Sequence, residues 1–147
     1  MRKDKKRDFI IIAVLVILIL LCMCYIVMIL KGYIKGKGVY DSIKDIAYST
    51  EVHNIDEEGV GDSKIKYYGV DLDLARRVNK DLISWIYIPD SNIDYPVVKG
   101  IDNNKYLDTL IDGSEGMNGT LFIDSRIEEY DKNLVIYGHN MKDGSMF

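Results

Sequence analysis

The apolar run from Phe9 to Leu30 constrains this chain more than any other feature of its sequence. Its 22 residues carry no charge, and a helix of that length, at about 1.5 Å per residue, reaches roughly 33 Å. That is enough to cross the hydrocarbon core of a bilayer. A cleaved signal peptide would have an apolar region of about 7 to 15 residues ending in small residues. This run is longer and KGYIKGKG follows it, so the sequence predicts a retained transmembrane helix over residues 9–30.

The charges that flank the apolar run predict its orientation. Five basic residues precede it and three follow it: Arg2, Lys3, Lys5, Lys6 and Arg7, then Lys31, Lys35 and Lys37. Because basic residues favour the cytoplasmic side, we expect residues 1–8 to be a cytoplasmic basic tip. The chain would then cross the cell membrane once, with its carboxyl-terminal domain extracellular.

Composition argues against nucleic acid as a partner. Without the first thirty residues the chain keeps 14 of its 19 basic and 21 of its 23 acidic residues, a formal charge of −7. Proteins that bind nucleic acid are usually basic.

Both cysteines, Cys22 and Cys24, lie inside the apolar run. We interpret them as small apolar residues of a membrane helix, with reversible acylation as the alternative. A thiolate surrounded by lipid would be poorly solvated, so neither is expected to act as a nucleophile outside the cell. A C-x-C pair without further ligands does not make a metal site, and we expect no metal and no cofactor.

After the apolar run the composition changes. Gly32, Gly36 and Gly38 alternate with lysines, which predicts a flexible hinge, and VYDSIKDIAYS predicts a short amphipathic helix. The stretch STEVHNIDEEGVGDSK is polar and reads as a loop, with His53 solvated and without a role. Residues 31–70 are therefore expected to be a juxtamembrane helix and linker.

Residues 71–147 have the pattern of a separate folded domain. VDLDLARRVNKDL predicts a helix, and NNKYLDTL predicts one or two helical turns. Four short stretches rich in β-branched and aromatic residues predict strands: WIYIP, IDYPVVKG, TLFIDSR and NLVIYGHN. We expect a mainly β domain of barrel or sandwich type.

The last of these strands carries a candidate catalytic residue. Alternation places Val135, Tyr137 and His139 on one face of the strand. A histidine beyond a glycine at the end of an apolar strand is suitably placed for acid/base work, although this signal alone is weak.

Five collinear blocks resemble the class B sortases: NKDLISWIYI, YPVVKG, NNKYL, GTLFIDSR and NLVIYGHNM. Sortases are membrane-anchored cysteine transpeptidases of Gram-positive bacteria, and their fold is an eight-stranded β-barrel. The resemblance covers roughly Leu72 to Phe147. It implies that residues 71–147 are the amino-terminal part of a sortase β-barrel, preceded by short helices and the transmembrane helix.

The resemblance also implies the roles of four residues. His139 in YGHNM corresponds to the catalytic histidine, the acid/base partner of a cysteine that attacks a sorting signal on a secreted protein. An amine of the cell wall then resolves the thioester. Asn103, Leu107 and Tyr137 would border the groove for the sorting peptide.

Two other parts of the sortase site have no counterpart here. No T-x-x-C motif occurs, and the arginines outside the basic tip all precede the histidine, whereas the catalytic arginine of sortases follows the cysteine: Arg76, Arg77 and Arg126. The resemblance therefore implies a sortase truncated before its cysteine and arginine. An open set of strands would expose edges, so we expect it to be unstable or aggregation-prone alone, and inactive.

Two alternatives remain. One is a membrane-tethered, non-catalytic extracellular module that binds sorting-signal peptides. The other is a different hydrolase that uses His139 with Ser125, Ser145 or a metal, although these residues lack a recognisable triad spacing.

Overall fold

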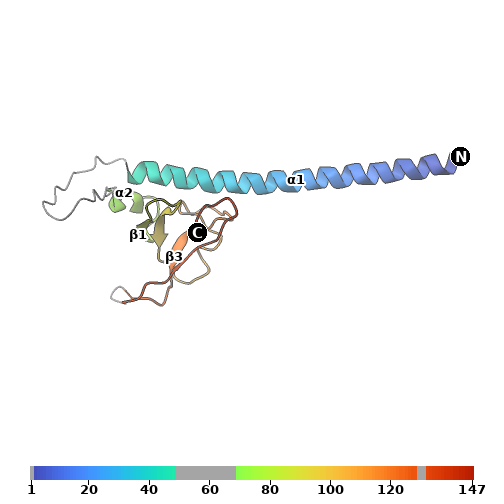
Figure 1. Cartoon of the computed structure of the whole chain (residues 1–147). Coiled ribbons are helices and arrows are strands. Elements are labelled where there is room, and N and C mark those ends of the chain that lie inside the picture. Colours follow the sequence, from blue (N-terminus) through green and yellow to red (C-terminus); the bar gives the residue numbers. More distant parts are fainter. Residues whose placement is uncertain (1, 49–68, 129–131) are drawn as a thin grey trace. The chain divides into compact units, whose positions relative to one another are not determined.

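The computed structural model describes residues 2–48, 69–128 and 132–147. The chain divides into two compact units, Met1–Ile34 and Lys35–Phe147. The described residues form the elements shown in Figure 1: α1 (Arg2–Ala47), α2 (Leu72–Arg76), β1 (Leu82–Tyr87), β2 (Asp94–Val98), β3 (Leu121–Ile123) and β4 (Ile136–Tyr137). His53 and most of the predicted linker lie outside the described residues.

The amino-terminal part of α1 is long and apolar enough to cross a membrane. Its most apolar 18-residue window has a mean hydropathy of 3.5, and none of that window is buried. A signal sequence near an amino terminus would have the same features. The span is therefore consistent with the predicted membrane helix.

Helix α1 continues without a break through the glycines where the sequence predicted a flexible hinge. Gly36 lies directly against Asn118, and a Cβ atom at Gly36 would overlap the side-chain amide of Asn118. One turn later, the Tyr40 hydroxyl donates hydrogen bonds to the Gly119 carbonyl and to Thr120 Oγ1. Packing within the second unit outweighs the low helix propensity of Gly36 and Gly38, so this segment is helical. The predicted amphipathic helix is the end of α1.

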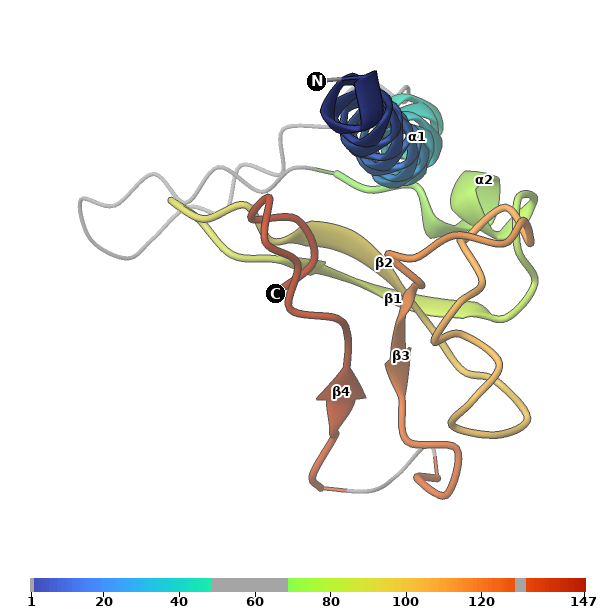
Figure 2. The same cartoon turned by 90° about the vertical axis from the view of Figure 1, so that its right-hand side faces the viewer.

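The second unit contains a four-stranded mixed sheet in the order β1-β2-β3-β4. β1 and β2 form an antiparallel hairpin, β2 and β3 are parallel, and β3 and β4 are antiparallel. Figure 2 shows β3 and β4 side by side. All four predicted strands are thus present. In the described residues β1 and β4 are both edge strands, so the sheet is open and no closed barrel is formed.

The connection between the parallel strands β2 and β3, residues 99–120, is a crossover without regular helix. The Asp102 carboxylate accepts hydrogen bonds from the backbone N–H groups of Asn104 and Lys105, at 2.9 and 2.8 Å. Farther along, Thr109 and Glu115 pair through an isolated bridge. Where helical turns were predicted, the chain therefore forms side-chain-capped turns.

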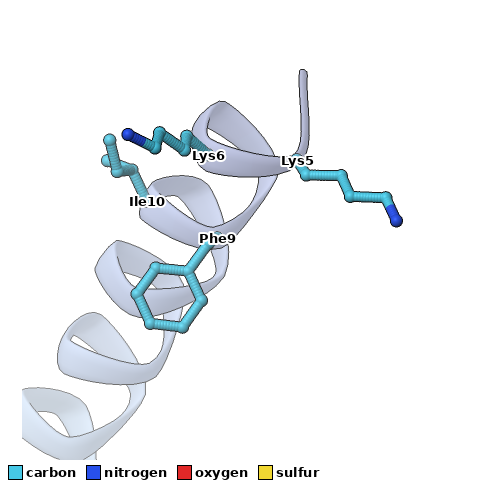
Figure 3. A pocket seen from close by; sticks show the side chains of 4 residues that line it. All are labelled: Lys5, Lys6, Phe9 and Ile10. Carbon is cyan, nitrogen blue, oxygen red and sulfur yellow. The ribbon is translucent and has the colours of Figure 1, made fainter. Parts of the chain in front are cut away.

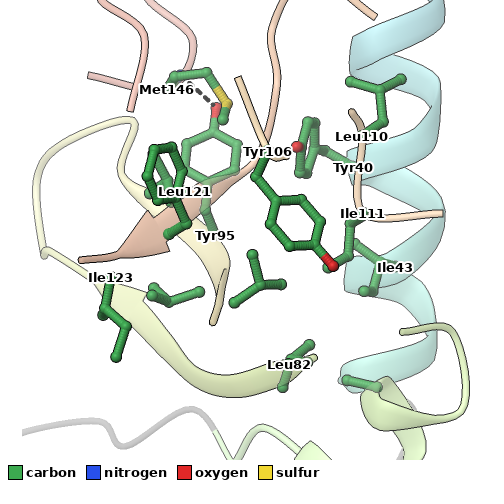
Figure 4. Packing of buried hydrophobic residues seen from close by; sticks show 14 of the residues in the cluster. Tyr40, Ile43, Leu82, Tyr95, Tyr106, Leu110, Ile111, Leu121, Ile123 and Met146 are labelled. Atoms are coloured by element: carbon green, nitrogen blue, oxygen red, sulfur yellow. Dashed lines mark hydrogen bonds between the residues drawn. The ribbon is translucent and has the colours of Figure 1, made fainter. Parts of the chain in front are cut away.

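The core of the second unit lies between the end of α1, the crossover and the sheet. Figure 4 shows Tyr40 and Ile43 of α1 directed toward the crossover residues Tyr106 and Ile111. The rings of Tyr40 and Tyr95 meet edge to face, with centroids 5.3 Å apart. Aromatic side chains bury large apolar areas, and this cluster fixes the crossover against the helix.

Candidate active site

The short strand β4 leads directly into His139. Gly138 is enclosed by Leu121 and Phe147, and a Cβ atom there would overlap both side chains. The Phe147 N–H donates to the His139 carbonyl at 3.0 Å, and Asn140 pairs with Met146 in an isolated bridge. The backbone around His139 is thus held closely against its neighbours.

The imidazole of His139 contacts the crossover through a backbone carbonyl. Its Nε2 lies 2.7 Å from the carbonyl oxygen of Leu107. A carbonyl oxygen can only accept a hydrogen bond, so Nε2 carries the proton. In the neutral ring, Nδ1 is then the nitrogen with the free lone pair. The contact therefore favours the Nε2–H tautomer of the neutral ring.

Asn103 and Tyr137 meet at the turn that follows β3. The side-chain oxygen of Asn103 accepts a hydrogen bond from the backbone N–H of Ser125 at 2.7 Å. The hydroxyl of Tyr137 donates to the carboxylate of Asp124 at 3.2 Å. The ring of Tyr137 also packs against Phe122, with centroids 5.4 Å apart. Residues 124–125 therefore connect two of the predicted groove residues.

Asp124 is the charged centre of this turn, and sequence reasoning did not identify it. Asp124 is only 4% exposed. Its carboxylate accepts hydrogen bonds from Nε and one terminal nitrogen of Arg126, at 2.9 and 2.6 Å. The Arg126 guanidinium and backbone N–H hold the pKa of Asp124 well below its usual range. A carboxylate placed directly after the apolar LFI of β3 is the signal that could have pointed to it.

The four residues predicted from the sequence thus take part in two sets of contacts. His139 touches Leu107, while Asn103 and Tyr137 both contact the turn at 124–125. Leu107 and Tyr137 are 39% and 38% exposed, so both leave apolar surface open to solvent.

In the described residues, no hydrogen bond joins His139 to a serine hydroxyl, as a serine hydrolase would require. The hydroxyl of Ser145 donates to the carboxylate of Asp143 at 2.7 Å. The Ser145 hydroxyl oxygen also accepts from the side-chain amide of Asn118 at 3.2 Å. His139 instead hydrogen-bonds the Leu107 carbonyl. Within the same ranges, no group of three or more His, Cys, Asp or Glu side chains could hold a metal ion.

A shallow hollow on α1 lies in the first unit and has none of these residues in its lining. Lys5, Lys6, Phe9 and Ile10 line it. In Figure 3, Lys5 and Lys6 point to opposite sides of the helix. Because its whole lining comes from two neighbouring turns of one helix, the hollow has no enclosing wall and does not form a ligand site.

Two curated proteins are similar to this chain. Sortase B of Listeria monocytogenes is 46% identical over 74 residues, which cover 49% of this chain and 30% of that protein. Sortase B of Staphylococcus aureus is 32% identical over 73 residues, which cover 48% of this chain and 30% of that protein. No family model matches the chain.

Solved structures show the same likeness. The crystal structure of sortase B from Bacillus anthracis in complex with AAEK1 matches with a TM-score of 0.61 and 27% sequence identity. The match covers 80% of this chain and 53% of that one. The chain therefore spans less than two thirds of the length of each of these three proteins.

Proposed function

Because this chain is a relative of the class B sortases over about half of its length, we propose that its second unit is the part of a sortase domain that carries the catalytic histidine. The proposed activity is that of a cysteine transpeptidase, which cleaves a sorting signal on secreted proteins and attaches them to the cell wall. The observation that supports it most is the hydrogen bond between His139 and the carbonyl of Leu107, a residue that the resemblance assigns to the peptide groove.

The chemistry proposed for His139 follows from its tautomer. In a sortase-type reaction, a cysteine thiolate attacks the carbonyl carbon of a peptide bond. The carbon–nitrogen bond breaks, the leaving amine takes a proton, and a thioester remains. A cell-wall amine then attacks the thioester, loses a proton and releases the thiolate. Nδ1 of His139 first takes the proton of the cysteine thiol, which leaves a thiolate beside an imidazolium. It then delivers this proton to the leaving amine and later removes one from the attacking amine, while Nε2 stays bound to Leu107.

The thiol of this reaction is assigned to polypeptide other than the 147 residues. Both cysteines of the sequence lie within residues 9–30, in the apolar part of α1. A thiolate in that setting would not meet an extracellular peptide. We propose that residues 1–147 alone are inactive and depend on further polypeptide for the cysteine and for an arginine that stabilises the oxyanion.

The proposed location is the outer face of the cell membrane. Residues 9–30 of α1 would be a single retained membrane span, because the run is longer than a signal peptide requires and more basic residues precede it than follow it. The second unit would then lie outside the cell, where sorting signals and cell-wall amines are available.

A second candidate is a tethered module that binds sorting-signal peptides without chemistry. The partial exposure of Leu107 and Tyr137 favours a peptide-binding surface even where no thiol is near. This candidate requires saturable binding of peptide and no turnover.

A complementation experiment separates these functions. The full chain, in detergent, is mixed with the carboxyl-terminal half of Listeria monocytogenes sortase B and with a fluorogenic peptide that this sortase cleaves. We expect cleavage only when both polypeptides are present, and none with His139→Ala. Peptide binding without cleavage would favour the module, and neither binding nor cleavage would overturn both proposals.

A further inference from the structure

The Leu107 carbonyl can set the tautomer of His139 only if it is itself held in place. The next residue toward the amino terminus, Tyr106, is 1% exposed and is anchored at both ends. Its hydroxyl donates to the Asp81 carboxylate at 2.7 Å and accepts from the Asn79 amide at 3.1 Å. Its own carbonyl accepts from the Thr120 N–H at 2.9 Å. Tyr106 therefore cannot shift without breaking these hydrogen bonds.

Gly119 packs closely against the backbone of Tyr106 and Leu107. It has a φ of +56°, and a Cβ atom there would overlap the carbonyl oxygens of both Tyr106 and Leu107. Glycine adopts this backbone conformation at little cost, and it allows the close approach. The Leu107 carbonyl is thus confined by Gly119 and by the anchored Tyr106.

The charges at the anchor favour a single direction for its hydrogen bond. Asp81 also binds the Lys105 ammonium, with Nζ 2.6 Å from the carboxylate. Lys105 and Tyr106 lower the pKa of Asp81, and burial raises the pKa of the Tyr106 hydroxyl. At neutral pH the phenol therefore donates and the carboxylate accepts.

We propose that Asp81 and Tyr106 are positioning residues for His139, which act through the Leu107 carbonyl to keep the imidazole in its Nε2–H tautomer. Neither side chain touches His139 in the contacts of the described residues. Their importance for catalysis rests on the proposed function, but the tautomer itself does not, because it can be observed without substrate or thiol.

Nuclear magnetic resonance of the ring nitrogens tests this proposal in the full chain. The sequence has two histidines, so a His53→Gln background leaves only the signals of His139. With the ring neutral, we expect its Nε2–H form to predominate. Tyr106→Phe keeps the buried ring but removes the hydroxyl. It should raise the ratio of the Nδ1–H to the Nε2–H form about fivefold, the effect of loosening one buried hydrogen bond.

Tyr48→Phe is the matched control. The Tyr48 hydroxyl also donates to an aspartate, Asp94, at 2.7 Å, but this pair lies at the end of α1 and not beside Leu107. The control should cost a comparable amount of stability and leave the tautomer ratio unchanged. A wild-type ratio in folded Tyr106→Phe would overturn the proposal, and so would an equal change in Tyr48→Phe.

Asp81→Asn keeps the inference testable if Tyr106→Phe does not fold. The amide retains the shape of the carboxylate and weakens the acceptor, so the ratio should move in the same direction by a smaller factor; an unchanged ratio would count against the anchor. The outcome is independent of the complementation experiment. A tautomer shift without cleavage would remove the proposed function alone, and cleavage with no shift in the variants would remove the positioning role alone.

Discussion

The hydroxyl of Tyr137 donates a hydrogen bond to the buried carboxylate of Asp124 at 3.2 Å, across the pair of strands β3 and β4. β4 has only two residues and lies at the edge of the sheet, so it forms few backbone hydrogen bonds of its own. Side-chain contacts such as this one therefore matter more for its position than they would in a long central strand.

We expect Tyr137→Phe to lower the free energy of unfolding of the second unit by about 1 kcal/mol, the typical net value of one hydrogen bond. In an Asp124→Ala background, the same substitution should cost less, because its partner is already absent. Fluorescence of Trp85, the sole tryptophan of the sequence, reports denaturant unfolding of this unit in the full chain. Equal costs in the two backgrounds would show that the two side chains are not coupled.

Acid should destabilise the second unit through its low-pKa carboxylates. Arg126 lowers the pKa of Asp124, and Lys105 lowers that of Asp81. A folded-state pKa below the unfolded value, which is about 3.9 for aspartate, gives stability that is present above that pH and is lost as pH falls through the folded pKa. We expect Tm to fall below about pH 4 as these groups take up protons.

Substitution identifies the groups responsible for the acid response. Asp124→Asn should lower Tm at pH 7 and flatten its decline in acid, because the amide does not titrate. Asp73→Asn removes a solvent-exposed partner of Arg76, and such exposed pairs contribute little. This control should keep the wild-type profile. A wild-type decline in Asp124→Asn would assign the acid sensitivity to other groups.

The elements with strong local patterns could be predicted from sequence. The 22-residue apolar run predicted a helix that could span a membrane, and β-branched and aromatic stretches predicted all four strands. Strand alternation placed Tyr137 and His139 on one face. In the structure, Tyr137 contacts Asp124 after β3, and His139 contacts Leu107 of the crossover. The catalytic role of His139 stays a prediction. So do the binding roles of Asn103, Leu107 and Tyr137.

The remaining features depend on contacts between distant parts of the chain. Helix α2 ends at Arg76, well before the predicted boundary, because the N–H groups of Arg77 and Val78 turn to carbonyls three residues back. Asn79 then donates to the Ile111 carbonyl, 32 positions away. Periodicity describes one segment at a time, so it cannot reveal such partners. The same holds for the carboxylates of Asp81 and Asp124.

Two glycines of α1 provide a matched test of packing within the second unit. Gly36→Ala should destabilise this unit, since the new methyl group would overlap the buried Asn118 side chain. Gly38→Ala should stabilise it by up to about 1 kcal/mol, because alanine favours helix and no atom lies within 4 Å of the new Cβ. Denaturant unfolding monitored by Trp85 fluorescence measures both. Stabilisation by Gly36→Ala would mean that α1 does not pack against Asn118 in solution.

The apolar part of α1 can be tested as a retained membrane span. If it is retained, the mass of the chain purified from membranes equals that of all 147 residues, whereas removal of a signal sequence would leave a shorter chain. Leu20→Arg places a charge near the middle of residues 9–30, where it costs about 2.5 to 3.5 kcal/mol on insertion scales. We expect this variant to reduce the membrane-bound fraction markedly, while Leu20→Ala leaves it near the wild-type level. Membrane association that is indifferent to the arginine would contradict a span at this position, and a shortened mass would contradict a retained one.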